Sequence, residues 1–298
     1  MVPLQKLQKR RPIEREAVAT GLWISLFRPW KGLEHPSLEF WYVLMKRKLG
    51  KKLSRDKCIF CGKRLRKKTR TKDHTPPRCL FPRGRNLPLI TVPSCRDCHE
   101  GESKDVEYFR LAIAFSRQAA ANPQAEEVTR KSLDSFLDDR ATKFRRSMAE
   151  KMQRCFVVNE NGFFEPSLAY ELDEQRIANV VTKTVQGLLW HNTGLRLPKS
   201  YGVAVFPSYN IDSLAPPERA ILLHLLSYEP EIIGKGIFDY RWDFRRPDGT
   251  CDSVWWLRFY ENISFLCFVM AKEEIRESLH RNTMGAVSPH SIPPSLPF

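Results

Sequence analysis

Two Cys-x-x-Cys pairs are the residues of this chain whose type and spacing most clearly predict chemistry. Cys58 and Cys61 form the first pair and Cys95 and Cys98 the second, with 33 residues between the pairs. Four thiolates at this spacing can close a tetrahedral zinc site, because each pair presents both sulfur atoms from one tight turn. A redox-active Cys-x-x-Cys usually occurs as a single pair in a β-α-β context. We therefore predict structural Zn²⁺ bound by all four cysteines.

Three side chains close to these pairs could carry acid–base or metal chemistry. Asp73 and His74 lie between the two pairs, and His99 directly follows Cys98. A neutral imidazole accepts a proton near neutral pH, and a carboxylate oxygen is a suitable ligand for a hard divalent ion. An isolated Asp-His would more simply be an ion pair on a strand. Its place between two zinc-binding pairs favours a chemical role.

Short elements around the cysteines must bring these side chains together. A Pro-Pro pair at residues 76–77 ends the segment that carries Asp73 and His74, which predicts a short strand there. After the second cysteine pair, apolar residues from Val106 to Phe115 recur at roughly helical spacing without an intervening proline, which predicts a helix. Two short strands followed by a helix, held at their base by zinc, would place Asp73, His74 and His99 on one side.

This order of motifs resembles the HNH endonuclease family, whose ββα-metal finger has an Asp-His pair on its first strand between two zinc-binding pairs. The resemblance covers roughly residues 58–109. Besides the cysteines, it rests on Asp-His-x-Pro-Pro, Leu-Ile-Thr-Val-Pro-Ser-Cys and Ser-Lys-Asp-x-Glu-Tyr-Phe. The family implies metal-dependent hydrolysis of nucleic acid phosphodiester bonds.

The resemblance also implies roles for individual residues. His74 falls at the position of the general base, Asp73 at a metal ligand and His99 at the second ligand of a catalytic divalent ion, which we expect to be Mg²⁺, Mn²⁺ or Ni²⁺. Because imidazole favours transition ions more than an amide oxygen does, activity should depend less exclusively on Mg²⁺ than in relatives with asparagine at this position. Asn86 is the candidate for the family's middle asparagine, which orients the catalytic histidine. The alternative interpretation is that Asn86 is simply a turn residue after Gly84.

Positive charge is concentrated in the first half of the chain. The net charge is +15; residues 1–150 hold 34 basic and 17 acidic residues, whereas residues 151–298 hold 15 and 17. Residues 46–72 contain fourteen Lys and Arg and one acid. Such a run is either a solvated, partly disordered segment or the partner of a polyanion. The residues that we expect to contact nucleic acid are Lys63, Arg64, Arg66, Lys67, Lys68, Arg70, Arg78 and Lys104.

The rest of the sequence predicts a second α+β region. Residues 125–152 read as one long helix, and Asn161-Gly162 between apolar runs indicates a hairpin. Residues 171–194 and 216–228 have helical spacing, and residues 232–270 read as a small antiparallel sheet. Its aromatic residues are interpreted as core rather than as a base-stacking platform; they include Trp255, Trp256, Phe259 and Tyr260.

We expect an α+β protein with four regions. These are a basic helical N-terminal segment (1–50), the HNH nuclease finger with its following helices (51–152), a C-terminal α+β domain of unknown role (153–280) and a disordered tail (281–298).

Composition excludes several classes of protein. At 298 residues with 42% hydrophobic and 28% charged residues, the chain is neither a disulfide-stapled miniprotein nor a mostly disordered protein. The most apolar stretch, from Trp255 to Met270, is interrupted by Arg258 and Glu261, so we expect no membrane span. The basic start leads into only a short apolar patch without a cleavage signal. We therefore expect a cytoplasmic protein.

The predicted function is metal-dependent cleavage of nucleic acid, with DNA favoured over RNA. The alternatives are a non-catalytic, zinc-stabilised nucleic-acid-binding protein and a zinc protein that binds other proteins. For the C-terminal region we expect a role in positioning substrate or in assembly, as a homodimer or with a protein partner.

Overall fold

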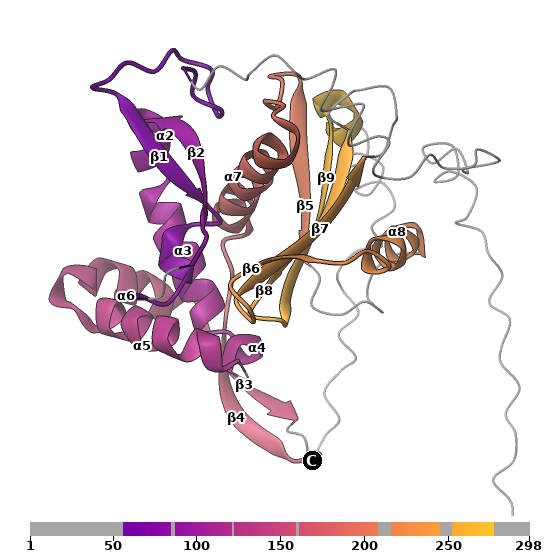
Figure 1. The fold of residues 1–298 in the computed structure, drawn as a ribbon. Helices are drawn as coiled ribbons and strands as arrows, with labels where there is room; N and C mark the ends of the chain where they lie inside the picture. The colour runs from indigo at the N-terminus through magenta and orange to yellow at the C-terminus, as the bar shows by residue number, and fades with distance from the viewer. Residues whose placement is uncertain are drawn as a thin grey trace, which may run out of the picture. The chain divides into compact units, whose positions relative to one another are not determined.

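The fold is mixed α+β, with small antiparallel sheets and helices on their faces (Figure 1). The computed structural model describes residues 56–84, 87–120, 122–158, 161–207, 216–244 and 252–276. The expected N-terminal segment (1–50), the expected tail (281–298) and Asn86 lie outside the described residues. The α+β prediction is confirmed at this level.

A two-stranded hairpin and two helices follow the first cysteine pair. Strand β1 pairs antiparallel with β2, and Asp73 lies opposite Val92 while His74 lies opposite Thr91. The expected helix after the second cysteine pair is confirmed as α3. The bounds of these elements are β1 Arg70–Thr75, η1 Arg78–Leu80, β2 Ile90–Cys95, α2 Arg96–Glu100 and α3 Ser103–Ala114.

The long helix expected over residues 125–152 is wrong, because the chain breaks into shorter helices. Asp138 ends α5 with an extended ψ of 141°, and Arg145 donates to the carbonyl oxygens of Phe136 and Asp138. An aspartate at this point competes with helical hydrogen bonding, and the guanidinium satisfies carbonyl groups that the helix end leaves open. The bounds are α4 Arg117–Ala120, α5 Pro123–Leu137, η2 Asp139–Ala141 and α6 Thr142–Glu150.

The expected hairpin around Asn161-Gly162 is confirmed. Strand β3 (Met152–Val158) pairs antiparallel with β4 (Phe164–Tyr170). Phe156 and Phe164 on this hairpin are 71% and 74% exposed. The hairpin therefore contributes little to the buried core.

A five-stranded antiparallel sheet lies between two helices. Its strand order is β5-β9-β8-β7-β6. Buried residues alternate along β8: Trp255 and Leu257 belong to the core that includes helix α7, whereas Val254 and Trp256 pack with helix α8. This alternation places the two helices on opposite faces of the sheet. The bounds are α7 Glu174–Thr193, β5 Tyr201–Pro207, α8 Pro216–Leu226, β6 Glu231–Ile233, β7 Phe238–Phe244, β8 Ser253–Phe259 and β9 Ile263–Ala271.

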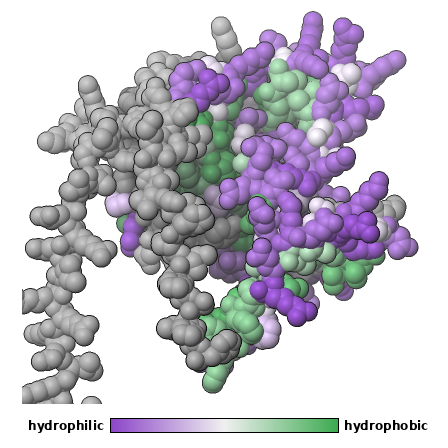
Figure 2. Space-filling model, turned by 180° about the vertical axis from the view of Figure 1, so that it is seen from behind, coloured by the Kyte–Doolittle hydropathy of each residue, from purple (hydrophilic) through white to green (hydrophobic). Residues whose placement is uncertain are grey.

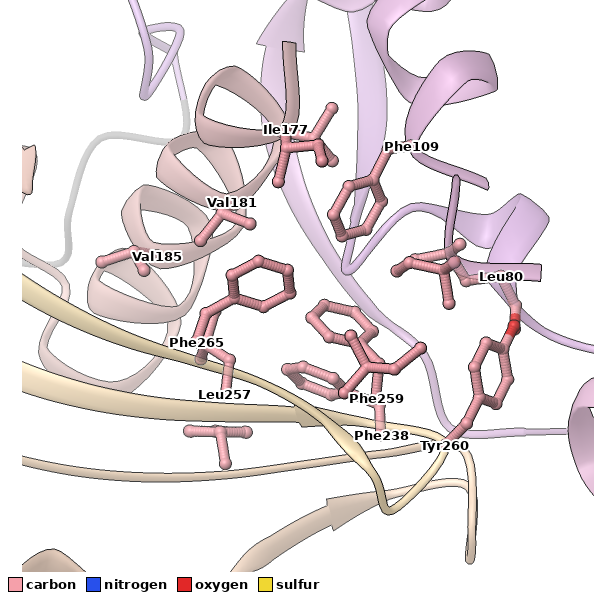
Figure 3. Packing of buried hydrophobic residues seen from close by; sticks show 14 of the residues in the cluster. Leu80, Phe109, Ile177, Val181, Val185, Phe238, Leu257, Phe259, Tyr260 and Phe265 are labelled. Carbon is pink, nitrogen blue, oxygen red and sulfur yellow. The ribbon is translucent and has the colours of Figure 1, made fainter. Parts of the chain in front are cut away.

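The main hydrophobic core joins both halves of the chain. Phe109 of α3 is fully buried, and its ring centroid lies 5.5 Å from Phe259 and 6.0 Å from Phe265 (Figure 3). The hydroxyl of Tyr260 donates to the carbonyl oxygen of Leu80 at 2.7 Å. The core thus contains residues from both sides of the expected domain boundary at residues 152–153. Whether the two regions are separate domains stays a prediction. The four aromatic residues expected in the core are all buried.

Within the part of the chain that the structure describes, no helix combines the length and the apolar character needed to cross a membrane.

Replacing Phe109 by alanine should lower the free energy of unfolding by about 3–5 kcal/mol, because the change leaves a cavity where α3 meets the sheet. Phe156→Ala is the matched control: its ring is exposed, so the change should cost about 0.5 kcal/mol or less. Urea titration of both variants measures the difference. Equal losses would show that α3 is not packed on the sheet as described.

Candidate functional site

Four cysteines come together at the base of the β1–β2 hairpin. Cys58 and Cys61 lie in the turn before β1, Cys95 ends β2 and Cys98 lies in α2. Their sulfur atoms all lie within 4.8 Å of one another, and those of Cys61 and Cys95 are 3.6 Å apart. Zinc–sulfur bonds of about 2.3 Å in a tetrahedron separate the sulfurs by about 3.8 Å. The cluster could therefore hold a structural metal ion such as zinc.

Local backbone geometry presents the first cysteine pair. The amide of Gly62 donates to the carbonyl of Cys58, and Gly62 has a φ of +77°, which an L side chain rarely adopts. The amide of Cys58 in turn donates to the carbonyl of Lys63. These bonds close a tight turn that points both sulfur atoms at the second pair.

The pKa values of the thiols in the cluster differ from one cysteine to the next. Burial raises the pKa of the Cys58 thiol. Hydrogen bonds from the backbone N–H groups of Cys61, Cys95 and Phe60 outweigh this effect and lower the pKa to about 7. Burial raises the pKa values of Cys61 and Cys98 above that of an ordinary thiol. A divalent metal would offset the mutual repulsion of four thiolates and stabilise all of them in the charged form.

Asp73 and His99 form a close pair beside the cluster. Oδ1 of Asp73 lies 3.3 Å from Nδ1 of His99, and the two side chains are 14% and 41% exposed. Asp73 comes from β1, whereas His99 follows Cys98 in α2. Since α2 begins directly after Cys95, the cysteine cluster also fixes the helix that presents the imidazole. The sequence expectation that these two residues approach each other agrees with this geometry.

His74 follows Asp73 on β1, and the pKa of its imidazole is lowered. Partial burial lowers the pKa of its imidazole, and the positive charge of Arg78 lowers it further. The charge of Asp73 acts in the opposite direction, and His99 adds a small lowering effect. His74 is thus within electrostatic reach of all three groups, and the net effect favours its neutral form.

Lys183 is the site residue that the sequence did not reveal. Its Nζ lies 2.8 Å from Oδ2 of Asp73 and 3.4 Å from Oε2 of Glu102, and it donates to the carbonyl oxygen of Cys98 at 2.7 Å. Burial raises the pKa of Glu102, and the charge of Lys183 partly opposes that effect. The only sequence signal was a lysine among the apolar residues of a predicted helix. Nothing in the pattern linked it to Asp73.

The cations expected to contact nucleic acid lie on the surface. Lys63 donates to Asp97 at 2.9 Å, so part of its charge is already neutralised. Figure 2 shows that much of the described surface on one face is hydrophilic. The structure places all eight residues in exposed positions: Lys63, Arg64, Arg66, Lys67, Lys68, Arg70, Arg78 and Lys104.

In comparisons with protein-family models, with curated proteins and with solved structures, nothing matches this chain.

Replacing Cys98 by serine should remove bound zinc, because serine does not supply a thiolate ligand and three cysteines hold the ion less tightly. Elemental analysis of the purified protein measures zinc per chain, and thermal unfolding measures the accompanying loss of stability. Cys79→Ser is the control, since Cys79 is exposed and outside the cluster. Full zinc content in Cys98→Ser would contradict the four-cysteine site.

Proposed function

We propose that this chain is a metal-dependent endonuclease of the HNH type that hydrolyses phosphodiester bonds in nucleic acid, with DNA favoured over RNA. The 3.3 Å approach of Asp73 to His99 is the observation that carries this proposal. The antiparallel strands β1 and β2, followed by helices and joined by four cysteines, support the assignment of a zinc-clamped ββα finger. The lowered pKa of His74, which senses the charges of Asp73 and His99, supports general base catalysis.

The Asp73–His99 pair fits a divalent ion. Ligands about 2.1 Å from one ion lie about 3.0 Å apart at right angles and about 3.4 Å apart in a tetrahedron. The observed 3.3 Å separation between Oδ1 and Nδ1 agrees with two ligands of the same ion. A pair of protein ligands also leaves coordination positions for water and phosphate oxygens, as is common for ions that act on nucleic acid. When bound, the ion would supply positive charge for the pentacovalent phosphorus and the leaving 3′ oxygen.

In this proposal, the side chains divide the work of hydrolysis. His74 takes a proton from the attacking water, and the lowered pKa of its imidazole keeps the accepting nitrogen available. Arg78 is exposed and close enough to influence His74, and in this proposal its guanidinium would bind a phosphate next to the reacting one. The exposed lysines and arginines around the hairpin would bind the flanking phosphates. Such contacts position nucleic acid without reading its sequence.

One observation favours the alternative, a non-catalytic, zinc-stabilised nucleic-acid-binding protein. Oδ2 of Asp73 already has a cation at 2.8 Å, the ammonium of Lys183. A carboxylate neutralised in this way is a weaker ligand if the lysine must be displaced. Binding of DNA or RNA that weakens steeply with salt, without cleavage in any metal, would support this alternative.

We expect the zinc-loaded protein to cleave supercoiled plasmid in the presence of Mn²⁺, Ni²⁺ or Mg²⁺, and His74→Ala to lower the rate about 10²–10⁴-fold, the usual contribution of a general base. Gel analysis of plasmid and of a single-stranded RNA, across this metal panel, identifies the substrate. His191→Ala is the control, because His191 is an exposed histidine near the end of α7. Undiminished cleavage by His74→Ala would exclude His74 as the base.

The acid side of the pH profile of kcat/KM should report His74. Activity should rise as pH increases through the pKa of the imidazole, because only its neutral form accepts a proton. Arg78→Gln removes a charge that lowers this pKa, so the rise should shift to higher pH. Arg83→Gln removes an exposed arginine that is not among the groups acting on His74 and should leave the position of the rise unchanged. An unshifted profile in Arg78→Gln would contradict the assigned electrostatics.

A further inference from the structure

We propose that Lys183 positions Asp73, which together with His99 forms the candidate pair of metal ligands, called here the metal pair. Because Lys183 lies on helix α7, binding of a divalent ion by Asp73 of β1 and His99 of α2 would depend on that helix. The two oxygens of Asp73 face different partners. Oδ1 lies 3.3 Å from Nδ1 of His99, whereas Oδ2 lies 2.8 Å from Nζ of Lys183. The contact with Lys183 is an ion pair without hydrogen-bond geometry, and its attraction for Oδ2 favours the orientation in which Oδ1 faces His99. Outer partners of this kind commonly orient the ligands of a metal.

Lys183 is itself held from several sides. Its ammonium donates to the carbonyl oxygen of Cys98, lies 3.4 Å from Oε2 of Glu102 and lies 4.9 Å from the centre of the Phe60 ring. Its side chain is only 14% exposed. Two of these contacts come from the cysteine turns, so the same turns that gather the sulfur atoms also fix the lysine. A side chain restrained in this way cannot swing freely into solvent.

Helix α7 is seated directly on β1 next to this contact. A Cβ added at Gly187, one turn after Lys183, would collide with Oγ1 of Thr75 and would lie 2.9 Å from its Cβ. Only a residue without a side chain permits this approach. Ile177, Val181 and Val185 of the same helix are buried against the sheet residues in Figure 3. The helix that delivers Lys183 is therefore anchored both on the hairpin and on the large sheet.

The charges favour positioning over competition with the metal. Asp73 and Glu102 supply two carboxylates near a single ammonium. Lys183 can stay paired with Oδ2 and Glu102 while Oδ1 and His99 bind an ion. If the lysine instead occupied the place of the ion, its removal would strengthen metal binding. The sign of the change in affinity thus separates the two roles.

The inference rests on the proposed function only through the Asp73–His99 metal pair, and the test examines that pair directly. Mn²⁺ binding to the zinc-loaded protein is measured by electron paramagnetic resonance of free Mn²⁺ and by calorimetry. Lys183→Met should weaken Mn²⁺ binding about 10–100-fold, the usual effect of removing an outer partner. Lys183→Arg, which keeps a charged donor, should restore most of the affinity. Lys235→Met, an exposed lysine in the turn before β7, should bind as the wild type does.

Three results would overturn the proposal. Unchanged or tighter Mn²⁺ binding by Lys183→Met would show that the lysine is irrelevant to the ion or competes with it. Equal losses in Lys183→Met and Lys183→Arg would show that shape, and not the charged donor, matters at this position. Zinc content and thermal unfolding verify that each variant folds, and Lys183→Gln replaces the methionine variant if that protein does not fold.

The variant Asp73→Ala distinguishes failure of the positioning role of Lys183 from failure of the proposed function. If the wild type binds Mn²⁺ and Asp73→Ala does not, Asp73 is a ligand of the ion. The Lys183 variants then decide only whether Lys183 positions it. If the wild type does not bind Mn²⁺, or Asp73→Ala binds it equally well, the metal pair is wrong, and the positioning role of Lys183 is wrong with it.

Discussion

The junction of the four cysteines constrains the rest of the candidate site. It joins the turn before β1 to the junction of β2 and α2. A long stretch of sequence separates that turn from this junction. Because Cys98 and His99 are consecutive, the direction of the imidazole is set by the same turn that places a sulfur atom. Short elements of this size have little core of their own, so a bound metal would contribute directly to their stability. The contact between Asp73 and His99 therefore depends on the cysteines that fix the start of α2.

Burial provides the second constraint, and it comes from the other half of the chain. Phe109 of α3 packs against Phe259 and Phe265 of the large sheet, and α7 fills the space between that sheet and the hairpin. The absence of a side chain at Gly187 lets this helix lie against Thr75. The residues of α7 and the large sheet are therefore structurally part of the candidate site. They supply the surface on which β1 is supported and the lysine that pairs with Asp73.

The sequence predicted the features that depend on local pattern. Spacing identified the cysteines, a proline pair and apolar periodicity located β1 and α3, and Asn161-Gly162 located the β3–β4 hairpin. It did not predict the break at Asp138, because charged and apolar residues alternate across it as in a continuous helix. Nor did it find Lys183. A contact between residues more than a hundred positions apart follows from tertiary packing, which one sequence without structure does not specify.

Two cations act on neighbouring side chains of β1 in different ways. Arg78 is exposed and acts through space, since its positive charge lowers the pKa of the His74 imidazole. Lys183 is largely buried and acts by direct contact with one oxygen of Asp73. Solvent screens an exposed charge much more than a buried one, so the influence of Arg78 should fall with salt while that of Lys183 persists. Neighbouring residues of one strand thus take their charged partners from different places: His74 from the surface and Asp73 from the interior.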